Sequence, residues 1–215
     1  MTPHRAIEFS NEVDQYLPLL KEAVRLIAHL AIRTRGTIGG SIAHADPSAE
    51  HPMMLFALDG EVVAESVRGS RKIPAADLFV SLLTTALEAD EVITEVQFPV
   101  MKPDSAYAAE EFARRPGDFA IAAVAVHLQF NGKRCRAARI ATAGIESQHG
   151  RLKSAEQVLE NNDITSEVID EAAAKAAETV NPQSDRQGSS EFRRHLTHVL
   201  CRRALNRAVQ RRAKV

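Results

Sequence analysis

The residues best suited to chemistry lie in one short stretch that is rich in glycine. Residues 33–47 read RTRGTIGGSIAHADP. Glycines lack a Cβ, so backbone N–H groups there can approach an anionic ligand closely, with a threonine and a serine hydroxyl beside them. The residues concerned are Gly36, Thr37, Gly39, Gly40 and Ser41. The spacing fits neither a P-loop nor a Rossmann fingerprint. It suits a pyrophosphate, and a tight glycine turn between two elements explains it equally well.

Two histidines and two acids overlap the end of this stretch, in the sequence HADPSAEH from His44 to His51. Their spacing is not the i, i+4 pairing of a helical zinc site, and Pro47 interrupts a regular scaffold. We therefore expect a loop that binds ligand hydroxyls through Asp46 or Glu50, in preference to a metal centre. The two cysteines, Cys135 and Cys201, form no CxxC or Cys/His cluster, and we expect two reduced thiols.

The elements that must position this stretch can be predicted from periodicity. An amphipathic helix is expected before the loop, and a helical turn after Pro47 carries Met53 and Met54 inward. Strands are expected on either side of a loop that enters a short helix. The expected ranges are helix 16–32, loop 33–47, strand 61–67, loop and short helix 71–79 and strand 91–98.

The second half changes its periodicity from strands to helices. Three strands are expected, the last two joined by the hairpin signal Asn131-Gly132-Lys133, and three helices follow. The expected strands are 107–114, 119–130 and 134–143, and the helices are 152–159, 164–180 and 191–212. Strands followed by helices indicate an α+β fold. Pro99–Asp104 marks the predicted boundary between domains 1–102 and 103–215.

The charge is distributed unevenly. The chain has 215 residues, 45% hydrophobic and 26% charged, with a net charge of −1, as expected for a globular protein. Residues 191–215 hold eight basic residues and one acid. This segment could bind nucleic acid, an acidic partner or the acidic remainder of the chain. Because Phe192 is its one aromatic residue, we favour docking to an acidic protein surface and expect no nucleic acid. With no long apolar stretch and no secretory leader pattern, we expect no membrane span and a cytoplasmic protein.

Five segments in order resemble one family. The glycine stretch IRTRGTIGGSIAHADPSAE is similar to the second flavin-binding loop of the FAD-binding (medium) subunits of molybdenum hydroxylases, the carbon monoxide dehydrogenase and xanthine dehydrogenase family. RGSRKIPAADLF, DEVITEV, RRPGDFA and SDRQGSSEFRRHL resemble further signatures of that family. The resemblance covers the chain from about Leu17 onward. It implies the C-terminal part of a two-lobed FAD-binding domain, followed by a small three-stranded antiparallel sheet with helices.

The resemblance also implies a function and its residues. FAD would relay electrons between a [2Fe–2S] small subunit and an acceptor, with hydroxylation on a molybdopterin-binding large subunit of a hetero-oligomer, and no residue of this chain would be catalytic. The implied contacts to the FAD phosphates and ribityl chain are Thr37, Gly39, Gly40 and Ser41, with Ala43 and His44 following along the loop. Asp46 and Glu50 resemble flavin hydrogen-bonding positions, and Ile93 would lie near the isoalloxazine.

Family members usually begin with a further lobe that carries an Ala-Gly-Gly-type loop. No such sequence precedes Leu17, so the pattern predicts a chain that lacks the first FAD lobe. The alternative function is then a truncated, non-flavin-binding scaffold or assembly subunit of such a complex.

Overall fold

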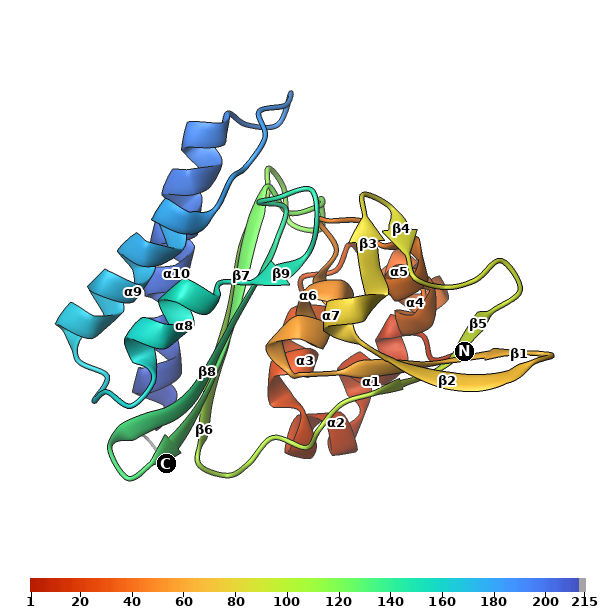
Figure 1. Ribbon diagram of the computed structural model, residues 1–215, viewed down its shortest axis with the longest axis horizontal. Helices are drawn as coiled ribbons and strands as arrows, with labels where there is room; N and C mark the ends of the chain where they lie inside the picture. The colour runs from red at the N-terminus through yellow and green to blue at the C-terminus, as the bar shows by residue number, and fades with distance from the viewer. Residues whose placement is uncertain (213–215) are drawn as a thin grey trace.

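A four-stranded antiparallel sheet stands between two groups of helices (Figure 1). The computed structural model describes residues 1–212. The strand order is β6-β7-β8-β9, and β7 and β8 are joined by the predicted hairpin at Gly132, where φ is +58°. The strands are β6 (Ser105–Phe112), β7 (Ala122–Asn131), β8 (Arg134–Ala143) and β9 (Gly150–Arg151). This sheet connects the two halves of the molecule.

The central strand β7 supplies side chains to two different cores, because neighbouring residues of a strand point to opposite faces. Val124, Val126 and Leu128 belong to the core shared with the C-terminal helices. Ala123 and Ala125 belong to the core shared with the N-terminal helices. Small alanine side chains let the N-terminal helices approach the sheet closely, whereas the larger residues on the other face fill the space under the C-terminal helices.

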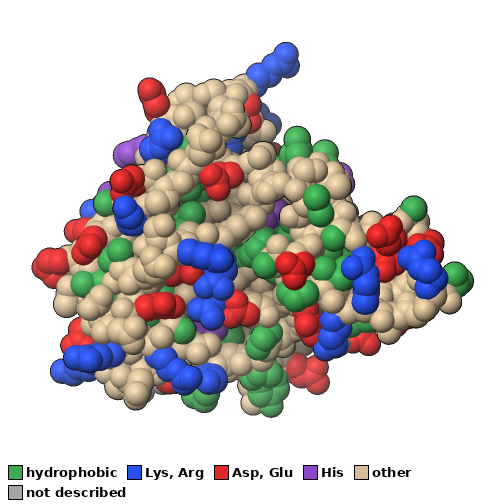
Figure 2. Space-filling model, viewed as in Figure 1, with side chains coloured by type: hydrophobic (Ala, Val, Ile, Leu, Met, Phe, Trp, Pro, Cys, Tyr) green, Lys and Arg blue, Asp and Glu red, His purple; other side chains and the backbone are tan. Residues whose placement is uncertain are grey.

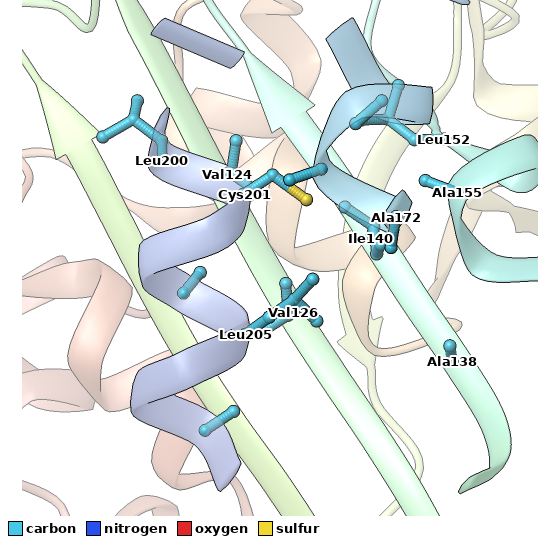
Figure 3. Packing of buried hydrophobic residues seen from close by; sticks show 14 of the residues in the cluster. Val124, Val126, Ala138, Ile140, Leu152, Ala155, Ala172, Leu200, Cys201 and Leu205 are labelled. Atoms are coloured by element: carbon cyan, nitrogen blue, oxygen red, sulfur yellow. The ribbon is translucent and has the colours of Figure 1, made fainter. Parts of the chain in front are cut away.

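The C-terminal helices cover the face with the larger side chains. In Figure 3 Val126 lies beside Leu205, and Ile140 lies beside Ala172. The helices are α8 (Lys153–Leu159), α9 (Ser166–Thr179) and α10 (Ser190–Arg212). All three predicted helices are confirmed within a few residues. The predicted three-stranded sheet gains a fourth strand, since β9 is only two residues long and too short to show alternation.

The N-terminal half combines short helices with a three-stranded antiparallel sheet of order β2-β1-β5. A separate two-stranded sheet, β3-β4, is formed by the part of the chain between β2 and β5. The helices are α1 (His4–Phe9), α2 (Asn11–Tyr16), α3 (Pro18–Val24), α4 (Leu30–Arg35), α5 (Ile38–His44), α6 (Glu50–Ala57) and α7 (Ala75–Leu78). The strands are β1 (Glu61–Ser66), β2 (Gly69–Pro74), β3 (Phe79–Ser81), β4 (Thr84–Thr85) and β5 (Val92–Gln97). The predicted strands 61–67 and 91–98 are therefore confirmed as β1 and β5.

The single helix predicted over residues 16–32 is wrong, because the chain forms α3 and α4 with a turn between them. Ala28 has a left-handed φ of +39°, which a continuous helix does not allow. The turn is held by Arg33, whose Nη1 donates to the carbonyl oxygens of Ile27 and Ala28 at 2.8 and 2.9 Å. Helical periodicity in the sequence continued across this turn and concealed it.

Two predicted loops are also wrong in part. Residues 33–47 contain the end of α4 and all of α5, because Thr37 caps a helix that includes both Gly39 and Gly40. Residues 69–74 form β2, which pairs in full register with β1. β2 is exposed at most positions and carries a polar sequence, so it shows no strand pattern. The short helix expected after it is confirmed as α7.

The basic helix α10 pairs with acids of its own chain. Arg207 and Arg211 both bind Glu22 on α3, and Arg207 also binds Glu110 on β6. On the face shown in Figure 2, basic and acidic side chains are likewise interspersed. Arg207 and Arg211 thus make the intramolecular match that the charge distribution allowed.

Candidate cofactor site

A cavity of about 580 Å³ opens between the N-terminal helices and a loop of the C-terminal half. Its wall includes six of the nine residues that the sequence singled out: Thr37, Gly40, Ser41, His44, Asp46 and Glu50. Further parts of the wall come from Ile27, Ala28, Ile32, Arg35 and Gly36 and from the loop 117–119. The helix α5 and the start of α6 thus bring the predicted polar residues to one place.

The start of α5 is built by a threonine cap. The Oγ1 of Thr37 accepts a hydrogen bond from the backbone N–H of Gly40 at 3.1 Å. A Cβ at Gly40 would lie 2.9 Å from that oxygen, so a side chain at this position would displace the cap. Glycine is therefore favoured at this position in the first turn of α5, so the stretch forms a capped helix and not the tight glycine turn that the sequence also allowed. The same turn leaves Ser41 on the cavity wall.

The turn between α5 and α6 gives Asp46 its position. Ala45 ends α5 in the left-handed conformation, with φ of +54°. The Oδ1 of Asp46 accepts from the N–H of Ser48 at 2.8 Å, and its carbonyl oxygen accepts from the N–H of Ala49 at 3.0 Å. Glu50 then begins α6. This local network fixes the backbone that carries the two acids predicted to bind ligand hydroxyls.

Burial raises the pKa values of Glu50, which lines the cavity, and of Glu111, which interacts with Glu50. It raises the pKa of Glu50 from 4.5 to about 7, with a smaller contribution from Asp46. Burial also raises the pKa of Glu111 on β6 from 4.5 to about 8, and Glu50 adds to this shift. Near neutral pH Glu111 therefore favours its protonated form, and Glu50 is divided between its two forms. A protonated carboxyl group can donate a hydrogen bond as well as accept one.

A pair of histidines lies behind these acids. The Nε2 of His51 and the Nδ1 of His4 are 2.8 Å apart, and both residues are buried. Burial lowers the pKa of His51 to about 3, and it lowers the pKa of His4 as well. Both rings are neutral at pH 7, so one nitrogen of the pair donates and the other accepts. His4 also lines the cavity, so the pair extends from its wall into the core.

Three predicted residues are not among those that line this cavity. Ala43 is exposed on α5, and Gly39 faces β5. A Cβ at Gly39 would lie 3.8 Å from Cγ2 of Ile93, which is an ordinary contact distance. Gly39 and Ile93 therefore lie beside each other. The resemblance implies different contacts for them: the phosphates or ribityl chain for Gly39, and the isoalloxazine for Ile93.

Other lining residues were not predicted. Arg35 places a cation at the cavity, and Asp118 and Phe119 reach it from the C-terminal half. Gly117 has φ of +86°, and a Cβ there would lie 2.7 Å from the His29 ring, so glycine is needed for this approach. The segment RRPGDFA resembles a family signature, and this resemblance is the sequence signal for the loop. Nothing in the N-terminal sequence marked His4.

The part of the chain that the structure describes, residues 1–212, contains no group of three or more His, Cys, Asp or Glu side chains placed to hold a metal ion. Within the same residues, no helix is long and apolar enough to cross a membrane.

The fold matches solved structures over nearly its full length. Carbon monoxide dehydrogenase from Hydrogenophaga pseudoflava superposes with a TM-score of 0.95 at 34% identity, covering 98% of this chain and 74% of that one. Quinoline 2-oxidoreductase from Pseudomonas putida 86 gives 0.91 at 34% identity, covering 98% and 73%. This similarity shows that the chain has the α+β fold found in these oxidoreductases.

The sequence comparisons identify the family. The FAD binding domain in molybdopterin dehydrogenase matches residues 1–101, and the CO dehydrogenase flavoprotein C-terminal domain matches residues 107–208. The nicotine 6-hydroxylase medium subunit of Paenarthrobacter nicotinovorans is 42% identical over 95% of this chain and 72% of its own length. The carbon monoxide dehydrogenase medium chain of Hydrogenophaga pseudoflava is 33% identical over 97% and 72%.

The chain belongs to the family of FAD-binding medium subunits of molybdenum hydroxylases, and its N-terminal half is an FAD-binding domain. Relatives of this kind are subunits of oxidoreductases. Because the FAD-binding match starts at residue 1, the comparisons do not show the missing first lobe that the motif pattern predicts.

Proposed function

We propose that this chain holds FAD in the cavity formed by α5, the turn at residues 45–49 and the loop 117–119, and that it relays electrons as one subunit of a molybdenum hydroxylase. The observation that carries this proposal is the convergence of six predicted residues on one cavity in an FAD-binding domain. Bound FAD would supply the redox chemistry, and the chain supplies binding, orientation and electrostatics.

The residues fit the polar part of such a cofactor. Thr37 and Ser41 present hydroxyls, Gly40 keeps the backbone bare of a Cβ, and Arg35 supplies a cation for phosphate oxygens. In this proposal Gly39 and Ala43 extend the contact along α5, and His44 continues it on the cavity wall.

Asp46 and Glu50 fit the part of FAD that carries hydroxyl groups. Asp46 accepts hydrogen bonds from cofactor hydroxyls, and Glu50 donates or accepts according to its protonation, because its pKa is about 7. Ile93 gives an apolar contact to the isoalloxazine from the side of β5. These roles give Asp46, Glu50 and Ile93 each a chemical partner in the cofactor.

The proposed complex contains a molybdopterin-binding large subunit and a small subunit with [2Fe–2S] clusters. Relatives are called medium subunits or chains, and one is called subunit alpha of the 6-hydroxypseudooxynicotine dehydrogenase complex. Electrons would pass from the iron–sulfur clusters through FAD to an acceptor. We further propose that residues 1–102 and 103–215 are the two domains of this subunit.

Flavin binding is tested on the purified full chain. We expect added FAD to show the shifted, structured absorption of a bound flavin and to remain bound on gel filtration. Gly40→Glu should abolish binding, because it places a side chain against Thr37 Oγ1 and an anion beside the phosphate contacts. Far-UV circular dichroism of the variant checks that its helices remain.

Complex formation is tested separately by co-expression with large and small subunits of a relative. Recovery of a three-subunit assembly containing flavin supports the proposed function. An assembly that forms without flavin, from a chain that also fails to bind FAD alone, would favour the scaffold function instead.

A further inference from the structure

His149 of the C-terminal half lies between two backbone carbonyl groups. Its Nε2 is 2.7 Å from the carbonyl oxygen of Asp46, in the turn that borders the cavity. Its Nδ1 is 3.3 Å from the carbonyl oxygen of Thr142 on β8. The residue is 7% exposed and is not among the residues that line the cavity. It therefore reaches the cavity only through Asp46.

The state of the ring follows from its surroundings. Burial lowers the pKa of His149, although the Asp46 and Thr142 carbonyls and the Asp46 carboxylate oppose this shift. The ring of Phe79 packs on the remaining side, with centroids 5.5 Å apart. A neutral imidazole has one N–H, and the shorter of the two contacts assigns it to Nε2, which donates to Asp46.

A second contact holds the next residue of the same turn. The N–H of Gly144 donates to the carbonyl oxygen of Pro47 at 2.8 Å. Gly144 is itself held by Arg193 of α10, whose Nη1 donates to its carbonyl oxygen and to that of Ile121. Gly144 has φ of +70°, and a Cβ would collide with the backbone of residues 120 and 121. The C-terminal half thus donates hydrogen bonds to two consecutive carbonyl groups, those of Asp46 and Pro47, in the turn between α5 and α6.

We propose that His149 is a positioning residue for the cofactor: its bond to the Asp46 carbonyl, with the Gly144 bond to Pro47, fixes the peptide that directs Asp46 and Glu50 into the cavity. This inference rests on the proposed function. It explains why a buried, polar histidine is placed at the end of a loop in the second half of the chain. An apolar side chain could fill the same space but could not hold the turn.

The test compares two substitutions at one position. His149→Met keeps an apolar side chain of similar length and removes the donor, whereas His149→Gln keeps an amide N–H in reach of the carbonyl. The control is His127→Met, since His127 on β7 is also buried and bonds to Ser105 Oγ at 3.2 Å, away from the turn. FAD dissociation constants are measured by titration of the full chain, with hydrogen–deuterium exchange of residues 45–50.

We expect the FAD dissociation constant to rise about tenfold in His149→Met, which corresponds to one lost hydrogen bond, and to stay within about threefold in His149→Gln and His127→Met. Exchange at residues 45–50 should accelerate only in His149→Met. If all variants bind FAD as the unsubstituted chain does, or if His127→Met weakens binding equally, the inference is overturned while the proposed function stands. If the unsubstituted chain binds no FAD, both fail.

Discussion

Arg211 near the end of α10 donates from Nη1 to Oε2 of Glu22 on α3 at 2.6 Å, although the two residues are 189 positions apart. Arg207 binds the other carboxylate oxygen of Glu22, which also accepts from the N–H of Ala109 on β6 at 2.8 Å. One carboxylate therefore ties a helix of the FAD-binding domain to both a helix and a strand of the C-terminal half. The Glu22 side chain is 20% exposed, so water screens these charges only in part.

Removal of this carboxylate should destabilise the whole chain. We expect Glu22→Ala to lower the free energy of unfolding by about 2–4 kcal/mol, because the N–H of Ala109 loses its side-chain acceptor and two arginines each lose one of their acceptors. Urea unfolding followed by circular dichroism measures the change. Glu178→Ala is the matched control: its bond to Lys175 lies on the surface, with the carboxylate 68% exposed, and it should cost less than about 0.5 kcal/mol. Equal losses in the two variants would contradict the assigned role of Glu22.

The perturbed carboxyl group of Glu111 predicts how stability depends on pH. The pKa of Glu111 rises from 4.5 to about 8 on folding, so between these values the folded chain holds a proton that the unfolded chain has released. Its contribution to stability is complete below about pH 4.5 and is lost as the pH rises through about 8. We expect Glu111→Gln to flatten the fall in melting temperature between about pH 5 and pH 9 and to be the more stable chain at the alkaline end, by about 2–4 kcal/mol. A parallel pH profile for the variant and the parent would be evidence against a buried, protonated Glu111.

For Gly40→Ala, helix propensity and packing predict changes in stability of opposite sign. Glycine to alanine within a helix usually stabilises by up to about 1 kcal/mol. At Gly40 the new Cβ would meet Thr37 Oγ1, so we expect Gly40→Ala to destabilise by about 1 kcal/mol and to weaken FAD binding about tenfold. Gly150→Ala meets open space and should change stability by less than about 0.5 kcal/mol. Thermal unfolding and FAD titration of the two variants distinguish these effects; a stabilised Gly40→Ala would rule out the steric requirement.

The cysteines should be unreactive in the folded chain. Both are buried, and burial raises the pKa of Cys135 to about 11 and of Cys201 to about 12. The thiolate, which is the reactive form, is then scarce at pH 8. A thiol reagent should label neither residue quickly in the native chain and both in denaturing guanidinium. Fast labelling of one thiol in the native chain would place that residue in a more accessible environment.

Local patterns in the sequence were sufficient for most elements of the C-terminal half. Strands with alternating side chains, a hairpin signal and helices of many turns each carry their own evidence along the chain, and β7, β8 and α9 appear where they were expected. The short helices and strands of the N-terminal half show less of this regular pattern in the sequence. Arg33 holds the turn at Ala28, and pairing with β1 holds the polar strand β2. Neither contact can be predicted from the periodicity of hydrophobic residues along the chain.

For the candidate site, residue types and the family resemblance were enough to predict which glycines, hydroxyls and acids of residues 37–50 would contact a flavin nucleotide. Long-range packing places six of them around one cavity and turns Gly39 toward Ile93. It also brings the loop 117–119 and His149 to this region from the other half of the chain. The physical reason is that residue type and spacing set the possible hydrogen bonds of a segment, whereas burial, pKa and hydrogen-bond partners across the interface exist only once the two halves pack on opposite faces of one sheet.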